Sequence, residues 1–171
     1  MGAYDVDLHP WLEAEKDWIR TLLADRVPVL GICLGAQLLA DALGGTAFKA
    51  DRPEVGLVPI TLTNAGTIDS VVSIAGPMVY AQHQDSFIPP PDATLLAYSD
   101  RFPHAFRLGS VLALQFHPDA DLDLALEWGK EDRSMLEAAG VDYEDYAREL
   151  TRAEPELDRA SRAIFTAWLQ E

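Results

Sequence analysis

The stretch from Val27 to Gly45 places the only cysteine of the chain between an apolar run and a run of strong helix formers. Residues Val29–Ile32 have the character of an interior strand, and residues 34–43 favour a helix that ends at a pair of glycines. The sequence therefore predicts a buried strand, a sharp turn at Cys33 and a helix that starts directly after it.

The pattern Gly31-x-Cys33-x-Gly35 is the cysteine version of a nucleophile elbow. Glycines on either side let the strand turn into the helix without Cβ clashes, which brings Cys33 into the open. Free N–H groups at the helix start favour the reactive thiolate, and the Leu34 amide would point at a developing oxyanion. A lone cysteine among apolar residues is as often a small buried hydrophobe, so this stretch alone leaves both interpretations open.

A second motif, QFHPD at residues 115–119, ends a strongly apolar run. Pro118 stops the strand, so His117 would lie at its end, beside Cys33 if the sheet is parallel and doubly wound. Asp119 would accept a hydrogen bond from the ring and hold the tautomer that a general base requires. The alternative is a histidine capping a strand beside a solvated aspartate, which the spacing alone favours.

Together, GICLGAQLL at residues 31–39 and QFHPD resemble the class I, triad-type glutamine amidotransferases, in particular stand-alone proteins similar to the glutaminase domain of GMP synthase. The resemblance implies an α/β fold with a doubly wound, mostly parallel, flavodoxin-like sheet. It makes Cys33 the nucleophile, His117 the base and Asp119 the third member, where the family usually has glutamate. Gln37, one helical turn after Cys33, would contact the substrate glutamine; its alternative is a solvated amide.

The resemblance also places His83 and Asp85, at the end of an expected strand over residues 78–82, close to the glutamine pocket. A surface hydrogen bond is an equal alternative. We expect no metal there, because two ligands without a third nearby in sequence do not make a site. Glu54 resembles a residue near the active-site mouth, but a solvated loop glutamate is favoured, and His104, like His9, is assigned to the surface.

The spacing of apolar residues along the chain predicts where its helices and strands lie. Apolar residues at helical spacing predict a helix over Trp11–Ala24, and strands are expected near residues 46–49, 57–63, 93–98, 105–108 and 111–116. We therefore expect an amidotransferase-like α/β domain over residues 1–119, N-terminally truncated relative to the family pattern, and a helical C-terminal extension over residues 120–171 packed on the same domain.

Composition restricts the partners. With 28 acidic and 13 basic side chains the net charge is −15, which argues against nucleic acid or an anionic membrane as partner. A single cysteine, no leader and no long apolar run favour a cytoplasmic protein. The resemblance implies no cofactor.

Three functional hypotheses follow. The first is a glutaminase in which Cys33 attacks the glutamine side-chain amide and releases glutamate and ammonia, with a separate acceptor enzyme for the ammonia. The second keeps the same residues but cleaves γ-glutamyl peptides. The third is a non-catalytic, truncated amidotransferase-like protein, since the glycine loop that supplies the second oxyanion amide has no counterpart here. An uncovered strand edge would also favour a homodimer.

Overall fold

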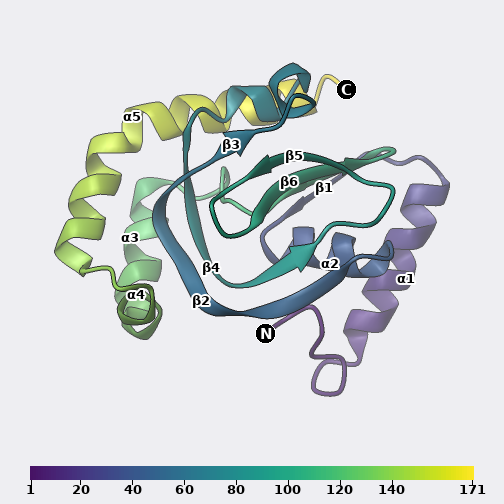
Figure 1. Ribbon diagram of the computed structural model, residues 1–171, viewed down its shortest axis with the longest axis horizontal. Helices are drawn as coiled ribbons and strands as arrows, with labels where there is room; N and C mark the ends of the chain where they lie inside the picture. The colour runs from purple at the N-terminus through teal and green to yellow at the C-terminus, as the bar shows by residue number, and fades with distance from the viewer.

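A computed structural model describes all 171 residues and shows two sheets flanked by helices (Figure 1). The main sheet has five strands in the order β1-β7-β6-β5-β3. In that order the strands are β1 (Val29–Ile32), β7 (Val111–Leu114), β6 (Pro103–Leu108), β5 (Thr94–Tyr98) and β3 (Thr61–Leu62). The second sheet is a long antiparallel ribbon of β2 (Thr46–Pro59) and β4 (Met78–Ile88).

Five α-helices surround the sheets, and none of them combines the length and apolar character that crossing a membrane requires. They are α1 (Trp11–Ala24), α2 (Leu34–Ala42), α3 (Leu122–Glu131), α4 (Arg133–Ala139) and α5 (Tyr143–Trp168), with two 3-10 turns, η1 (Gly66–Ile68) and η2 (Val72–Ile74). In Figure 1, α1 lies to the right of the sheet, whereas α3, α4 and α5 lie to its left and along its top. The last three helices form the expected helical C-terminal segment.

The core lies on both faces of the main sheet, and β7 contributes to each. Val111 and Ala113 pack on the side of α1 and α2, whereas Leu112 and Leu114 pack on the side of α5. All four are fully buried, because successive side chains of a strand point to opposite faces. This explains why β7 has a continuous apolar sequence rather than an alternating one.

The α/β class is confirmed, but strand directions differ from the mostly parallel sheet that we expected. Only β1 and β7 run parallel, and the pairs β7-β6, β6-β5 and β5-β3 are antiparallel. Short connections cause this for the pairs β6-β5 and β7-β6, since a chain that returns through a tight turn can only form an antiparallel neighbour, whereas β3 and β5 are joined by a long segment that contains β4. The sheet is therefore mixed, with its one parallel pair at β1.

Two strands are longer than expected. The expected strands near residues 46–49 and 57–63 are largely one strand, β2, and β4 continues through His83 and Asp85 instead of ending before them. The two strands pair over Thr46–Lys49 and again over Glu54–Pro59, with a shift of register between Lys49 and Glu54, so polar side chains do not end the pairing. The two residues therefore lie within a strand.

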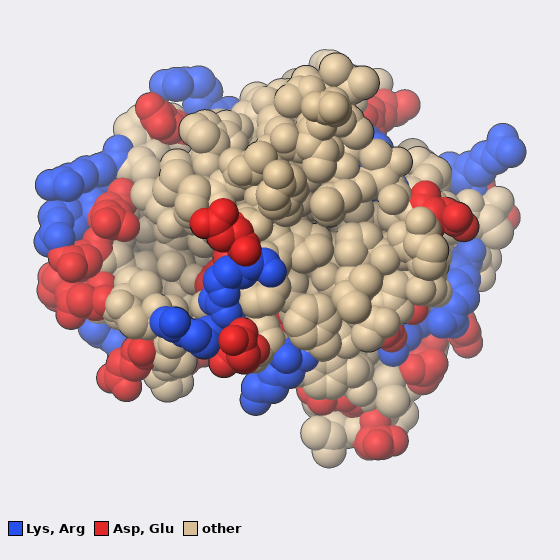
Figure 2. Space-filling view, in the orientation of Figure 1, with Lys and Arg blue, Asp and Glu red and all other residues tan.

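Charged side chains are mixed on the face shown in Figure 2. Lys and Arg side chains lie next to Asp and Glu side chains around the rim and just left of the centre, and they do not gather into one patch on this face. The upper centre of this face and the area right of its centre are largely uncharged.

The turn from β1 into α2 is tight. Cys33 has φ 51° and ψ −106°, a backbone conformation that residues other than glycine rarely adopt. A Cβ atom at Gly31 would lie 2.7 Å from the backbone of Gly35, because α2 starts directly against β1. At Gly35 an added Cβ would meet no atom within 4 Å, so the steric need for glycine holds on one side of Cys33 only.

The crowded environment of Gly31 and the open environment of Gly35 predict opposite effects of alanine substitutions on the stability of the chain. Gly31→Ala should lower the free energy of unfolding by roughly 1–3 kcal/mol, because the added methyl group overlaps the backbone of α2. Gly35→Ala should change it by less than about 1 kcal/mol, and in the stabilising direction, because alanine favours the helix. Urea unfolding of both variants measures this, and equal losses of stability would contradict the described turn.

Candidate active site

Cys33 and His117 meet at one edge of the main sheet because β1 and β7 are parallel. Ile32 pairs with Leu114, so both strands end at the same level. The backbone N–H of Cys33 donates to the carbonyl of Leu114 at 2.8 Å, which fixes the turn against β7. Cys33 is partly exposed at this edge of the sheet.

His117 is held by its neighbours on several sides. Its Nδ1 lies 3.1 Å from Oδ1 of Asp119, and its backbone N–H donates to the carbonyl of Tyr80 at 2.8 Å. The ring of Trp128 on α3 packs edge-on against the imidazole, with ring centroids 5.0 Å apart. We did not anticipate Trp128 and Tyr80, because only the fold brings α3 and β4 to this edge.

Electrostatics favour a charged His117. Burial lowers the pKa of the ring, but the hydrogen bond to Asp119 and the interaction with Cys33 outweigh it and raise the pKa to about 9. Burial likewise raises the pKa of the Asp119 carboxyl, but the bond from His117 brings it below its usual value. At neutral pH the site therefore holds an imidazolium between a carboxylate and a sulfur.

Leu34 and Gln37 both lie on α2, but they have different environments. Leu34 is the first residue of the helix, so its N–H is among those that find no partner within the helix. Gln37 is only 3% exposed, and its Nε2 donates to the carbonyl of Asp85 at 3.0 Å and to Oε1 of Gln115 at 3.3 Å. The solvated alternative for Gln37 is wrong, because its amide joins α2 to β4.

His83 and Asp85 point in different directions. The Asp85 carboxylate accepts a hydrogen bond from the hydroxyl of Tyr4 at 3.0 Å, and burial together with this carboxylate raises the pKa of Tyr4 to about 12. His83 is 3% exposed and lies 3.3 Å from a carboxylate oxygen of Glu54. The structure thus brings Cys33, His117 and Asp119 together and places His83 in a separate buried cluster.

Glu54 and His104 are corrections to the expectation from the sequence that both lie in solvent. His104 is fully buried and Glu54 is 9% exposed. The reason is topological: β6 lies between β5 and β7, and the β2-β4 ribbon carries Glu54 onto it. The sequence signal for the burial of His104 was its position within an otherwise apolar run, Phe102–Phe106.

Comparison with known protein families gives one clear match. The family described as glutamine amidotransferase class-I matches residues 6–127, a stretch that includes the elbow and the His117 motif.

Two curated relatives are GMP synthases. The glutamine-hydrolysing GMP synthase of Helicobacter pylori (strain P12) is 39% identical over 95 residues, which are 54% of this chain and 18% of that protein. One subunit of the glutamine-hydrolysing GMP synthase of Sulfolobus acidocaldarius is 34% identical over 109 residues, which are 60% of this chain and 55% of that protein. The chain thus spans about half of the second relative and less of the first.

Solved structures extend the similarity over the whole chain. A glutamine amidotransferase from Thermotoga maritima has a TM-score of 0.85 and 26% identity, covering 100% of this chain and 75% of the other. A second one, from Methylobacillus flagellatus, has a TM-score of 0.84 and 25% identity, covering 99% of this chain and 72% of the other. The helical C-terminal segment is therefore part of the shared fold.

The raised pKa of His117 predicts a direction of pH dependence. A folded-state pKa of about 9, above the ordinary 6.5, contributes stability that is fully present below pH 6.5 and is lost as the pH rises through about 9. An NMR titration of the ring protons should give a pKa near 9, and Asp119→Asn should lower it. If the pKa of His117 were near 6.5 both in the unmodified chain and in Asp119→Asn, Asp119 would not stabilise the charged ring.

Proposed function

Because this chain belongs to the glutamine amidotransferase class-I family, we propose that it hydrolyses the side-chain amide of glutamine through a thioester on Cys33. The observation that supports this most is the parallel pairing of β1 and β7. It places a partly exposed cysteine in a strained turn beside a histidine that a carboxylate orients. A nucleophile, a base and a group that orients the base are the parts that acyl transfer requires.

In the proposed first half-reaction, the sulfur of Cys33 attacks the amide carbon of glutamine. The carbonyl oxygen becomes negatively charged, and the N–H of Leu34 at the start of α2 donates to it. His117 then gives its proton to the amide nitrogen, which leaves as ammonia while the γ-glutamyl group stays on the sulfur. The raised pKa of His117 suits this step, because the ring carries the required proton at neutral pH.

In the proposed second half-reaction, His117 is neutral and removes a proton from water. The resulting hydroxide attacks the thioester carbon, the N–H of Leu34 again stabilises the oxyanion, and glutamate and the Cys33 thiolate are released. A single oxyanion donor is typically worth about 10²–10³ in rate. Leu34 therefore carries a measurable part of the proposed rate enhancement.

Asp119 and Gln37 have supporting roles in this proposal. Although aspartate is one methylene shorter than the family's usual glutamate, Oδ1 of Asp119 still lies 3.1 Å from Nδ1 of His117. Gln37 holds α2 in place, because its buried amide bonds the carbonyl of Asp85. His83 donates to the same carbonyl, so it would act on the site through the backbone of β4.

We further propose that the ammonia passes to a separate acceptor protein. The Sulfolobus relative is named as one subunit of a GMP synthase, which supports an acceptor on another chain. The expected homodimer remains a prediction; β1 forms one edge of the main sheet and would be the strand that a second copy covers.

Release of ammonia and glutamate from glutamine tests the proposed function. Cys33→Ala should lower the turnover at least about 10³-fold, because no other group in the site can form the thioester. Its unfolding curve should stay close to that of the unmodified chain. Turnover of glutamine that survives in Cys33→Ala would disprove the assignment of the nucleophile.

A γ-glutamyl dipeptide, supplied in place of glutamine, separates the alternative hydrolase from the glutaminase. Both substrates form the same thioester on Cys33 and differ only in the leaving group. We expect glutamine to have the higher kcat/KM. The reverse order would assign the site to γ-glutamyl peptides.

A further inference from the structure

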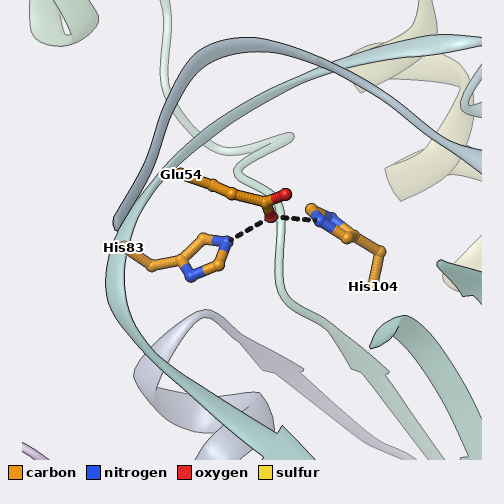
Figure 3. Close-up of side chains that lie close together, drawn as sticks. All are labelled: Glu54, His83 and His104. Carbon is orange, nitrogen blue, oxygen red and sulfur yellow. Dashed lines mark hydrogen bonds and ion pairs between the residues drawn. The ribbon is translucent and has the colours of Figure 1, made fainter. Parts of the chain in front are cut away.

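Three strands bring a carboxylate and two imidazoles together in the interior. Glu54 comes from β2, His83 from β4 and His104 from β6, and both Nε2 atoms point at the same carboxylate oxygen (Figure 3). Oε2 of Glu54 lies 2.9 Å from Nε2 of His104 and 3.3 Å from Nε2 of His83. The proposed glutaminase reaction uses none of these three side chains directly.

Hydrogen bonding fixes which nitrogen of His83 carries a proton. Nδ1 lies 2.9 Å from the backbone carbonyl of Asp85, and a carbonyl can only accept, so Nδ1 is the protonated nitrogen of the neutral ring. Nε2 then presents its lone pair to the carboxylate of Glu54, and it has no hydrogen-bond partner although it is buried. Two acceptors facing each other in the interior are unfavourable unless a positive charge lies between them.

A divalent metal ion between the two acceptors would supply this charge, as a proton on Nε2 would. In tetrahedral zinc sites the ligand atoms lie about 2.0–2.2 Å from the metal, and therefore about 3.4 Å from each other. The two separations between carboxylate and imidazole come within about half an ångström of this value, and the three ligand atoms all lie within 4.8 Å of one another. Small side-chain shifts would bring the three ligand atoms to coordination distance, and a water molecule would have to fill the fourth tetrahedral position.

The surroundings of the cluster resemble those of metal-binding residues. A histidine ligand usually donates its other N–H to a carbonyl, as His83 does to Asp85. The second oxygen of Glu54 accepts a hydrogen bond from Ser99 at 2.7 Å, which orients the carboxylate. Ligation by His104 would move its proton to Nδ1, which is buried and bonds no other group, so His104 lacks the second partner that His83 has.

We propose that Glu54, His83 and His104 form a binding site for a divalent transition metal ion of the zinc class. Imidazole and carboxylate are ligands that zinc accepts readily. The ligands are almost fully buried, which denies a substrate access to the ion. We therefore assign the ion a structural role, with three protein ligands in place of the four that structural zinc sites usually have. Its effect is to tie the β2-β4 ribbon to β6 of the main sheet.

The test is a titration of the chelator-treated chain with zinc, in which calorimetry measures the heat of binding. Elemental analysis after dialysis then gives the amount of zinc that stays bound. We expect one equivalent of zinc per chain, and at least about tenfold weaker binding in both Glu54→Gln and His104→Gln. Cys33→Ser is the essential control, because Cys33, His117 and Asp119 are also potential zinc ligands. His9→Gln, outside the cluster, controls for histidine substitution as such.

Two readouts keep the test decisive if the cluster variants fold poorly. In Cys33→Ser, zinc should shift the NMR signals of the His83 and His104 rings. At a hundredfold excess over its dissociation constant it should raise the midpoint of thermal unfolding by roughly 5–10 °C. Absence of binding, or binding that Cys33→Ser abolishes while His104→Gln retains it, would overturn the proposed site.

Discussion

The parallel pairing of β1 with β7 is the constraint on which the proposed site depends. It sets Ile32 opposite Leu114, so that the residues following the two strands leave the sheet at one edge. Packing on both faces holds the register, since a slip of one residue would turn every side chain of β7 to the wrong face. The apolar sequence of β7 thus determines where His117 lies relative to Cys33.

The strained turn at Cys33 depends on the same pairing. A non-glycine residue outside the common backbone regions costs on the order of 1–3 kcal/mol, and it persists only where its surroundings determine it. Here the hydrogen bond from Cys33 to Leu114 and the close approach of α2 to Gly31 determine it. In return, the sulfur lies at the start of a helix and beside the charged ring of His117.

What could be predicted from the sequence was governed by local rules. Helical spacing gave α1 its observed bounds, and the glycines and helix formers predicted β1 and α2. The strand before His117 ends at Leu114, earlier than residue 116, to which we expected it to run. The meeting of Cys33 and His117 required one further assumption, parallel neighbouring strands, which the two motifs together justified. These features depend on residues close together in the sequence or on a single pairing.

What could not be predicted depends on pairing between distant segments. The length of β4, and with it the burial of His83, is set by its partner β2 some thirty residues earlier in the chain. Glu54 is buried only because this ribbon lies on β6, where it meets His104. Charge and spacing describe Glu54 as an ordinary surface residue, and no local pattern reports such a contact.

Covalent labelling by a glutamine analogue tests the central claim most directly, because it requires only the first attack by Cys33. The analogue carries a diazoketone in place of the side-chain amide. Once its diazo carbon has taken up a proton, an activated thiolate in a glutamine site attacks that carbon, dinitrogen leaves and a stable S–C bond remains. Mass spectrometry should find one adduct per chain, located on Cys33, and an excess of glutamine should prevent it. No adduct, or an adduct on another residue, would contradict the account of Cys33 as a glutamine-directed nucleophile.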